Sequence, residues 1–489
     1  MSTGSDVADL PLLSAADSDA PLAWYDGRFI GRREYLAHVA QAAARLPERG
    51  HAVNLCNDRY HFMVGLGALL LRGQVNLLPP NHAPQVIDEI AAEYDAYCLV
   101  DQSLEGIAAP TAELDFTGAV PAPERVPLLP AAQTAVVLFT SGSTGRAKPT
   151  PKSWGQLVGG TEIALRRLGL DLNPAQLVAT VPAQHSYGLE STVLYAMLSA
   201  CTVHAGRPFY AEDVRAALAE VPAPRVLVTT PVHLRACTEA GLQWPETAFV
   251  LSATAPLPEA LARGAEQAFG CPVHEIYGCS EAGALASRRT LDGPVWQPYE
   301  SIRIGQGAET CVEAPHLPGP QPLADALKTH PDGRFELLGR TADMLNIAGK
   351  RGSLQDLNQR LLSIDGVEDG AFLLTGDDAN SRLAALVVAP GLDRSHILGR
   401  LRRALDPVFL PRPLVMVDAL PRNATGKLTR QAMLELLARH RDVPGQNAAA
   451  GLLGPAPAAA PLLWHQGHEV TRSEFIRHAR ALAATLPEA

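Results

Sequence analysis

Short apolar runs alternate with longer segments of mixed character along the first two thirds of the chain. The runs have the length of buried strands and are bounded by Gly and polar residues; they include AVVLF (135–139), RVLVTT (225–230), AFVLSA (248–253) and VHEIYG (273–278). Between the last two, EALARGAEQAFG (259–270) has the apolar spacing of an amphipathic helix. Because strands that alternate with helices form parallel sheets, we predict an α/β fold, with a large N-terminal domain of parallel-sheet βαβ subdomains over residues 1–340.

The last third of the chain has a different organisation. Residues 341–444 contain short strand-like and helix-like segments, such as AALVVAP and SHILGRLRRAL, in a stretch the size of a small domain. We expect a small, mobile α+β C-terminal domain here. Residues 445–460 are rich in Ala, Gly and Pro and are predicted to form a linker.

The segment 461–489 repeats the pattern of residues 21–48 without gaps and with about a dozen identities. Trp24 aligns with Trp464, and an aligned Gly and a shared Leu-Pro-Glu accompany that pair. Two Ala-rich helices can match by chance, but the aligned Trp and Gly argue against chance. We interpret the segment as the opening of a second, similar unit.

Composition and charge narrow the class of protein. The chain of 489 residues is 47% hydrophobic and 19% charged, which is typical of a globular protein. A formal net charge of −10 and a pI near 5.8 argue against a nucleic-acid partner, but a locally positive pocket can still bind an anion. The start of the chain lacks the features of a signal peptide, and FMVGLGALLL (62–71) is too short to span a bilayer. We expect a buried helix at 62–71, no integral membrane segment and a cytoplasmic protein.

Two common cofactor patterns are missing from the sequence. The seven cysteines are scattered without a Cys-x-x-Cys pair, a spacing that indicates neither a zinc site nor a disulfide framework. GLGALL, within 62–71, lacks the third Gly of a dinucleotide fingerprint. A Rossmann dehydrogenase is therefore disfavoured.

The strand predicted at 135–139 ends in a loop rich in hydroxyl groups and glycines, within LFTSGSTGRAKPT (138–150). A Walker loop requires Gly, four residues and then Gly-Lys-Ser/Thr, and this loop does not have that spacing. Its hydroxyls, its backbone N–H groups and one lysine charge nevertheless suit a polyphosphate. A polar surface turn is the alternative. The candidate phosphate-binding residues are Thr140, Ser141, Gly142, Ser143, Thr144, Gly145 and Lys148.

Four separated stretches resemble, in order, the signatures of the adenylate-forming superfamily; they are TSGSTGRAKP, YGCSE (277–281), GRTADMLNIAGKR (339–351) and LPRNATGK (420–427). This superfamily comprises acyl- and aryl-CoA synthetases, non-ribosomal peptide adenylation domains and luciferases. Four motifs in order are far more specific than one. The resemblance implies an acid–thiol ligase that uses ATP and Mg²⁺. A carboxylate attacks the α-phosphate of ATP with release of pyrophosphate, and a thiol then displaces AMP.

The resemblance also implies roles for individual residues. Lys427 matches the catalytic lysine, whose ammonium can bridge the substrate carboxylate and the α-phosphate region. Glu281 matches the glutamate associated with Mg²⁺, an ion that prefers carboxylate ligands. Further ATP and AMP contacts fall on the adenine side at Ala253, Tyr277 and Gly278, and on the ribose side at Asp325 and Arg340.

By the same resemblance, His185 in VPAQHSYGLE occupies the position of an aromatic or His residue that gates the acid pocket, so it joins Lys427 as a catalytic candidate. A histidine with a purely structural role is the alternative. The acid-binding positions implied by the resemblance are His185, Ser186, Tyr187, Gly188, Ser252 and Gly278.

Three motif positions depart from the family pattern. The family's Pro-Lys-Gly is Ala-Lys-Pro around Lys148, and its Thr-Gly before Asp325 is Leu-Ala. The hinge position two residues after Arg340 is Ala342. Because a hinge needs backbone freedom more than charge, Ala342 is compatible with rotation of the small domain between the half-reactions.

Weaker similarity bears on the acid and the thiol. VATVPAQHSYGLESTVLYAML, RPFYAEDV and VLVTTPVHLRA look like segments of the adenylating enzymes of bacterial aryl-polyene and xanthomonadin pigment biosynthesis. That resemblance, nearest to ligases for 3-hydroxybenzoate, implies a hydroxybenzoate as the acid and the phosphopantetheine of an acyl carrier protein as the acceptor. The alternatives are a coenzyme A ligase for an aryl or medium-chain acid, and an adenylate-binding pseudo-enzyme or scaffold. The presence of Lys427 and Glu281 argues against the pseudo-enzyme.

Overall fold

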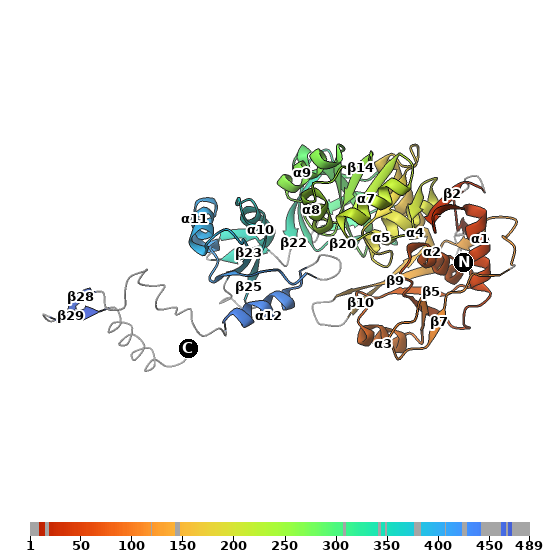
Figure 1. Cartoon of the computed structure of the whole chain (residues 1–489), viewed down its shortest axis with the longest axis horizontal. Coiled ribbons are helices and arrows are strands. Elements are labelled where there is room, and N and C mark those ends of the chain that lie inside the picture. The colour runs from red at the N-terminus through yellow and green to blue at the C-terminus, as the bar shows by residue number, and fades with distance from the viewer. Residues whose placement is uncertain are drawn as a thin grey trace, which may run out of the picture. The chain divides into compact units, whose positions relative to one another are not determined.

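The computed structural model describes residues 9–14, 19–118, 120–141, 147–306, 310–340, 344–347, 350–375, 383–405, 407–422, 428–441, 461–465 and 468–471; at some strand ends, Thr140, Ser141 and Arg340 among them, it describes the backbone alone. The chain forms two compact units, Met1–Thr429 and Arg430–Ala489 (Figure 1). The domain boundary expected at residue 340 remains a prediction.

A six-stranded sheet forms in the N-terminal part of the chain. In order across the sheet its strands are β10 (Ala147–Ser153), β9 (Thr134–Ser141), β5 (Val75–Leu78), β4 (His51–Asn54), β6 (Tyr97–Val100) and β7 (Thr111–Glu113). The strands from β9 to β7 are parallel, and β10 runs antiparallel to β9. The strand predicted at 135–139 is confirmed as β9, and the predicted buried helix lies within α2 (Arg59–Leu71).

A second sheet of eleven strands carries most of the candidate site. In order its strands are β21 (Asp325–Thr329), β22 (Phe335–Arg340), β17 (Val295–Pro298), β16 (Gly283–Arg289), β15 (Val273–Cys279), β14 (Phe249–Ser252), β13 (Arg225–Thr229), β11 (Gln176–Ala179), β12 (Thr202–His204), β2 (Pro21–Tyr25) and β3 (Arg28–Gly31). The strands from β15 to β2 are parallel, and those outside them are antiparallel. The remaining three predicted strands are confirmed as β13, β14 and β15, whose carboxyl ends meet at one edge.

Helices cover both faces of the second sheet. Side chains of α7 (Ala211–Glu220), α8 (Pro231–Glu239) and α9 (Glu259–Phe269) pack on one face, and those of α4 (Trp154–Leu168) pack on the other. Because both faces are buried, the central strands are continuously apolar, which made them recognisable in the sequence. The helix predicted at 259–270 is confirmed as α9.

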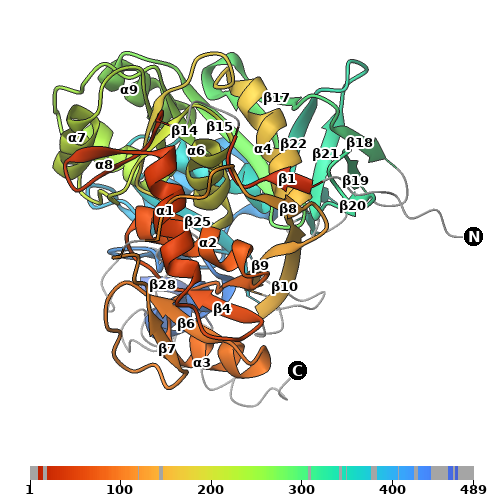
Figure 2. The ribbon, with the colours of Figure 1, turned by 90° about the vertical axis from the view of Figure 1, so that its right-hand side faces the viewer.

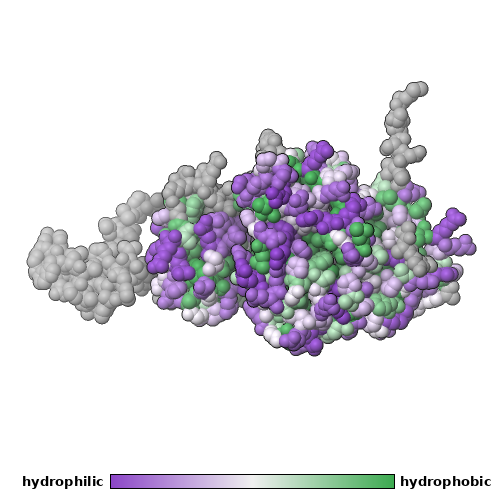
Figure 3. Space-filling view, turned by 90° about the horizontal axis from the view of Figure 1, so that it is seen from above, coloured by the Kyte–Doolittle hydropathy of each residue, from purple (hydrophilic) through white to green (hydrophobic). Residues whose placement is uncertain are grey.

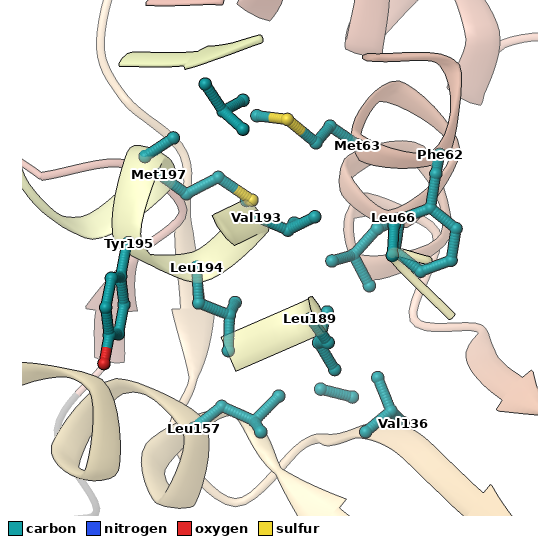
Figure 4. Packing of buried hydrophobic residues seen from close by; sticks show 14 of the residues in the cluster. Phe62, Met63, Leu66, Val136, Leu157, Leu189, Val193, Leu194, Tyr195 and Met197 are labelled. Carbon is teal, nitrogen blue, oxygen red and sulfur yellow. The ribbon is translucent and has the colours of Figure 1, made fainter. Parts of the chain in front are cut away.

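The largest core cluster joins the two sheets through the helices between them. Met63 and Leu66 of α2 face Leu189 and Val193 of a π-helical turn, η1 (Leu189–Leu194), as Figure 4 shows. All four side chains are fully buried, and burial of each contributes about 1.5–3 kcal/mol. Turns of this type are uncommon and often lie at functional sites; η1 directly follows the predicted acid-binding segment.

The other elements of this part of the chain are short or peripheral. Helix α1 (Arg32–Ala43) packs along α2 (Figure 2). The remaining elements are α3 (Pro84–Glu93), α5 (Ser186–Gly188), α6 (Tyr195–Leu198), the 3-10 turn η2 (Thr290–Asp292), the pair β1 (Asp9–Pro11) and β8 (Leu128–Pro130), and the small sheet of β18 (Arg303–Gln306), β19 (Thr310–Glu313) and β20 (Gln321–Pro322). Hydrophilic residues cover most of the face seen in Figure 3, with apolar residues in scattered patches. No helix in the described ranges has the length and apolarity needed to cross a membrane.

A smaller α+β arrangement follows the eleven-stranded sheet. Its elements are the hairpin β23 (Met344–Ile347) and β24 (Lys350–Ser353), helices α10 (Leu354–Leu362) and α11 (Arg394–Ala404), the turn η4 (Pro407–Phe409) and the sheet of β25 (Asp369–Leu374), β26 (Leu383–Val388) and β27 (Leu414–Met416). It has a hydrophobic cluster of its own, built on side chains such as Leu361, Phe372 and Ile397. AALVVAP and SHILGRLRRAL are confirmed as β26 and α11.

The second unit contains α12 (Arg430–Arg441) and a hairpin of β28 (Pro461–His465) and β29 (His468–Thr471). The hairpin has the register of β2 and β3, including an irregularity at the same place. Trp24 pairs with Phe29 in one hairpin, and Trp464 pairs with Glu469 in the other. The sequence repeat therefore extends to the backbone of these hairpins, and a second similar unit remains a prediction.

Candidate active site

The hydroxyl-rich loop connects two antiparallel strands. Thr140 pairs with Lys148 across β9 and β10, so the loop lies at the tip of a β-hairpin. Gly142, Ser143, Thr144 and Gly145 lie outside the described residues, and the backbone of Thr140 and Ser141 ends β9. No helix follows the loop directly, which agrees with the exclusion of a Walker loop from spacing.

Lys148 lies close to the glutamate that the sequence assigns to the metal. Its Nζ is 3.9 Å from Oε1 of Glu281, and the two side chains are 69% and 34% exposed. An ion pair this exposed contributes about 0–1 kcal/mol to stability, so either group can exchange this contact for another partner at little cost in free energy. The structure therefore brings a predicted phosphate ligand and the predicted metal ligand to one place.

Glu281 fits the way in which proteins hold Mg²⁺ on a nucleotide. This ion usually takes one or two carboxylates and completes its shell with phosphate oxygens and water. Among the described residues, no group of three or more Asp, Glu, His or Cys side chains forms a metal cage. A single, partly exposed carboxylate near the predicted phosphate loop is compatible with the donor set of a Mg²⁺–nucleotide complex.

The predicted adenine and ribose residues also come together. The Tyr277 hydroxyl donates to Oδ2 of Asp325 at 2.8 Å, and Asp325 pairs with Arg340 across β21 and β22. The Tyr277 ring packs near Trp296 and Phe335, with ring centroids 5.9 and 5.6 Å away. An aromatic ring therefore lies beside a carboxylate that can accept from two ribose hydroxyls.

The segment from His185 to Gly188 begins the helix that continues into η1. Nδ1 of His185 accepts a hydrogen bond from the backbone N–H of Tyr187 at 3.3 Å, so the histidine caps this helix. The Tyr187 hydroxyl donates to the carbonyl of Leu251 in β14 at 2.9 Å. Burial raises the pKa of Tyr187 well above its usual value, so the phenol remains neutral. The contact ties the predicted acid-binding segment to the carboxyl end of β14.

A small pocket lies next to His185. Nδ1 of His233 in its wall is 3.1 Å from the Thr230 hydroxyl, and burial lowers the pKa of His233, which favours the neutral imidazole. The walls therefore carry hydroxyl and imidazole groups with little charge. The lining residues are Thr180, Val181, Pro182, His185, Thr230, His233 and Thr254.

Ser252 ends β14, and Ala253, the next residue, lies on a different face of the sheet from it. Val250 packs with α8 and α9, whereas Leu251 and Ala253 belong to the cluster that contains Tyr187. Because side chains alternate along a strand, Ser252 shares the face of Val250. Its buried hydroxyl has no hydrogen-bond partner among the described residues. The structure thus brings Ala253 to the face of Tyr187 and leaves the Ser252 side chain on the other face.

Gly278 occupies a position that only glycine fits. A Cβ atom there would lie 2.3 Å from the carbonyl oxygen of Gly283 on the neighbouring strand, far below any normal contact. The ladder between β15 and β16 is irregular between Tyr277 and Gly278, which allows this close approach. This tight contact between Gly278 and Gly283 closes the turn between β15 and β16, which contains Glu281.

Lys427 and Arg340, two of the predicted residues, have limited structural descriptions. Lys427 lies outside the described residues, and Arg340 is described by its backbone at the end of β22.

Two charged residues that the sequence analysis did not single out, Lys152 and Glu190, pack behind the turn that carries Glu281. Each is a lone charge next to apolar positions, in PTPKSW and YGLESTVL. A charge that stands alone among uncharged residues is the sequence feature by which these two residues could have been found.

Comparison with protein families decides between the readings of this site. Residues 15–314 match the family model described as AMP-binding enzyme. The chain belongs to the AMP-binding enzyme family. The matched segment contains the hydroxyl-rich loop, His185, Tyr277 and Glu281.

Ligases are among the relatives of this family member. The chain is 30% identical over 302 residues to the 4-coumarate–CoA ligase of Rhodobacter capsulatus. This alignment covers 60% of the chain and 75% of that protein. The chain is 29% identical over 238 residues to the L-proline–[L-prolyl-carrier protein] ligase of Pseudomonas fluorescens, which covers 47% of this chain and 43% of that protein. The match thus spans three quarters of the first relative and less than half of the second. These relatives confirm the predicted enzyme class, an AMP-forming acid–thiol ligase.

Solved structures confirm the fold class. The o-succinylbenzoate CoA synthetase of Bacillus subtilis, in complex with its acyl-adenylate intermediate, has a TM-score of 0.75 at 18% identity, and the match covers 87% of this chain and 98% of that one. The chain therefore has the mixed α/β fold of adenylate-forming ligases, with a large region of parallel sheet.

Proposed function

We propose that this AMP-binding enzyme activates 3-hydroxybenzoate with ATP and transfers the acyl group to the phosphopantetheine thiol of an acyl carrier protein. The reaction would resemble that of the 3-hydroxybenzoate:acyl-carrier-protein ligase of xanthomonadin biosynthesis. One observation carries the chemistry: Tyr277, in β15, contacts Asp325, and Glu281, in the turn that follows β15, lies beside Lys148. In the proposed binding mode the ribose lies at the first pair and the phosphates lie at the second.

In the proposed first step a carboxylate oxygen of the acid attacks the α-phosphorus of ATP. The bond from that phosphorus to the pyrophosphate oxygen breaks, and an acyl-adenylate forms. Lys148 and Lys427 supply positive charge where two anions meet. Glu281 would hold Mg²⁺, which when bound neutralises phosphate charge. Asp325 and Arg340 would orient the ribose.

In the proposed second step the thiol sulfur attacks the acyl carbon, and the bond from that carbon to the phosphate oxygen of AMP breaks. The thiol proton leaves to solvent or to a nearby base. His185 lies beside the cavity lined by Thr230 and His233, and we propose that it separates the acid pocket from the path of the thiol. Its role is to gate access, since Nδ1 already accepts from the helix backbone.

Three considerations support the choice of acid and acceptor. Tyr187 provides a flat, buried and neutral ring next to Ala253, as an aromatic acid requires. The name of the first relative gives an aromatic acid with coenzyme A, and that of the second gives a carrier protein. Similarity to the pigment-pathway enzymes favours the combination of an aromatic acid with a carrier protein.

ATP–pyrophosphate exchange tests the acid. We would compare 3-hydroxybenzoate, 4-hydroxybenzoate, 4-coumarate and octanoate, and we expect the strongest exchange with 3-hydroxybenzoate. Exchange with octanoate alone would overturn the aromatic assignment and leave the adenylation chemistry intact. The Lys427→Ala variant should lose exchange while ATP binding, measured by calorimetry, is largely kept; unchanged exchange would remove Lys427 from the proposed step.

Product analysis tests the acceptor. After incubation with ATP and the preferred acid, intact-protein mass spectrometry should show acylation of a carrier protein that bears phosphopantetheine. The same protein without phosphopantetheine is the control and should remain unmodified. Efficient formation of the acyl-coenzyme A, with no acylated carrier protein, would replace the proposed acceptor by coenzyme A.

A further inference from the structure

Three side chains from separate elements lie behind the turn that carries Glu281. The Lys152 ammonium, from β10, donates to the carbonyl of Glu281. A carboxylate oxygen of Glu190, from η1, accepts from the N–H of Ala284, at the start of β16, at 3.1 Å. His316, from the segment after β19, lines the pocket behind the turn together with Ala282. Two backbone groups of this stretch, the carbonyl of Glu281 and the N–H of Ala284, thus have side-chain partners from other elements.

The three side chains pack together behind the turn. Lys152 is 3% exposed, and Lys152, Glu190 and His316 line one cavity together with Thr161 of α4. Burial lowers the pKa of Lys152 and raises that of Glu190, and the opposite charge of each partner counters the shift. An uncompensated charge at such a place costs several kcal/mol. The opposite charges therefore offset part of the cost of burying each other.

Helix α4 is shaped to admit the third side chain. A Cβ atom at Gly159 would lie 2.6 Å from the Cβ of His316, so the histidine approaches the helix where glycine leaves room. Burial lowers the pKa of His316, which favours the neutral ring. The Glu190 carboxylate has a second fixed contact, since the Ser186 hydroxyl donates to it at 2.9 Å. The network therefore also reaches the predicted acid-binding segment.

The geometry points to a positioning role: we propose that Lys152 and Glu190, with His316 packed in the same pocket, hold the backbone from Glu281 to Ala284 so that the Glu281 carboxylate faces the phosphate loop. This inference rests on the proposed function, in which Glu281 holds the metal on the nucleotide. A fixed backbone restricts the directions available to that carboxylate. Groups that orient a metal ligand typically change metal affinity by about 10- to 100-fold when they are removed.

The test measures nucleotide binding without turnover. Calorimetry with α,β-methylene ATP, in the presence and absence of Mg²⁺, gives the Mg²⁺-dependent gain in affinity for the wild type and each variant. We expect Glu281→Gln to lose that gain. We expect Lys152→Met to reduce it by about tenfold, and Lys152→Arg, which keeps a donor, to restore most of it. Hydrogen exchange across residues 279–286 should be faster in Lys152→Met.

Two further variants separate positioning from stability. The Lys152→Met/Glu190→Gln double variant removes both charges, so we expect it to be more stable than either single variant while the Mg²⁺-dependent gain stays reduced. If Lys152→Met alone fails to fold, the Mg²⁺-dependent gain in affinity is measured on the double variant instead. Glu275→Gln is the control: this carboxylate is 3% exposed and accepts from the N–H of Leu257 and from the side chains of Arg288 and Thr290, away from the turn. It should leave the gain unchanged.

The outcomes distinguish this inference from the proposed function. A normal Mg²⁺-dependent gain in Glu281→Gln would overturn the metal role of Glu281 and the inference with it. Loss in Glu281→Gln combined with a normal gain in Lys152→Met and in the double variant would overturn the positioning role alone. An equal reduction in Glu275→Gln would also overturn it, since any buried carboxylate would then have the same effect.

Discussion

Replacing Tyr277 with Phe removes one hydroxyl and keeps the ring, so it isolates a single contact of the candidate nucleotide site. The hydroxyl donates to Oδ2 of Asp325 at 2.8 Å, and Asp325 pairs with Arg340 across the strands. A hydrogen bond to a charged group contributes about 1.5–3 kcal/mol. Asp325 is partly exposed, so water replaces part of the contact and we take about 1 kcal/mol. That free energy corresponds to about a fivefold change in affinity.

The expected result is a rise of about fivefold in the KM for ATP in pyrophosphate exchange, with kcat changed by less than about twofold. Such a split is expected because the contact orients the ribose and lies away from the reacting atoms. Calorimetric titration with ATP should give the same ratio.

The matched control for this prediction is Tyr299→Phe. The Tyr299 hydroxyl is buried and has no hydrogen-bond partner within the described part of the chain. Its removal is the same chemical change without the loss of a contact, so the KM for ATP should stay at the wild-type value. An unchanged KM in Tyr277→Phe, or an equal rise in both variants, would refute the assignment of Tyr277 and Asp325 to the nucleotide.

Three further changes have defined outcomes. Lys148→Met should raise the KM for ATP about tenfold and leave the melting temperature nearly unchanged, since its exposed contact with Glu281 contributes little to stability. Hydrogen bonding from Arg289 lowers the pKa of Glu266 below its ordinary 4.5; the pair therefore stabilises the fold above that pH and loses its contribution as the pH falls through the lowered pKa. Thermal unfolding of Glu266→Gln should show a deficit of about 1 kcal/mol or less at pH 7 that shrinks below pH 4.5, because Arg289 is partly exposed; a constant deficit would contradict this. Gly278→Ala should destabilise by about 1–3 kcal/mol and impair exchange, because the added methyl meets a backbone carbonyl; normal unfolding and exchange would show that the turn can adjust.

The strands of the central sheet were predictable because their physical requirement is local. β13 and β14 are buried on both faces, so each appears as a continuous apolar run bounded by polar residues, whereas β15 carries His274 and Glu275 among its apolar positions. The parallel arrangement follows from the helices between them, and with it the meeting of their carboxyl ends. The contact between Tyr187 and Leu251 agrees with that expectation, since it joins the acid-binding segment to the end of β14.

Assignments by motif position were less complete because a motif does not record which face a side chain occupies. Ser252 and Ala253 are neighbours in the sequence, and both fell into the site by position. The alternation along β14 separates them, and Ala253 alone shares a face with Tyr187. The period of two along a predicted strand contains this information, so the separation was available from the sequence once the strand was recognised.

The contacts behind the turn were beyond prediction for a different reason. Lys152 and Glu281 are 129 positions apart, and Glu190 and Ala284 are 94 apart. No local period links residues at such separations, because their proximity depends on how β10, η1 and β15 pack. A lone charge in an apolar stretch indicates that a partner exists, and the fold decides which residue it is.

Lys148 and Lys152 have identical side chains, but their different burial gives them different contacts. Both project from the same face of β10, because four is an even number of strand positions. The Lys148 side chain is 69% exposed, so its ammonium can exchange water for the oxygens of a phosphate or of the Glu281 carboxylate. Lys152 is 3% exposed and has no such freedom, and its ammonium meets the backbone carbonyl of the same glutamate. The place of each lysine along β10, at the open end or in the core, therefore determines which one is available to the substrate and which one fixes the backbone.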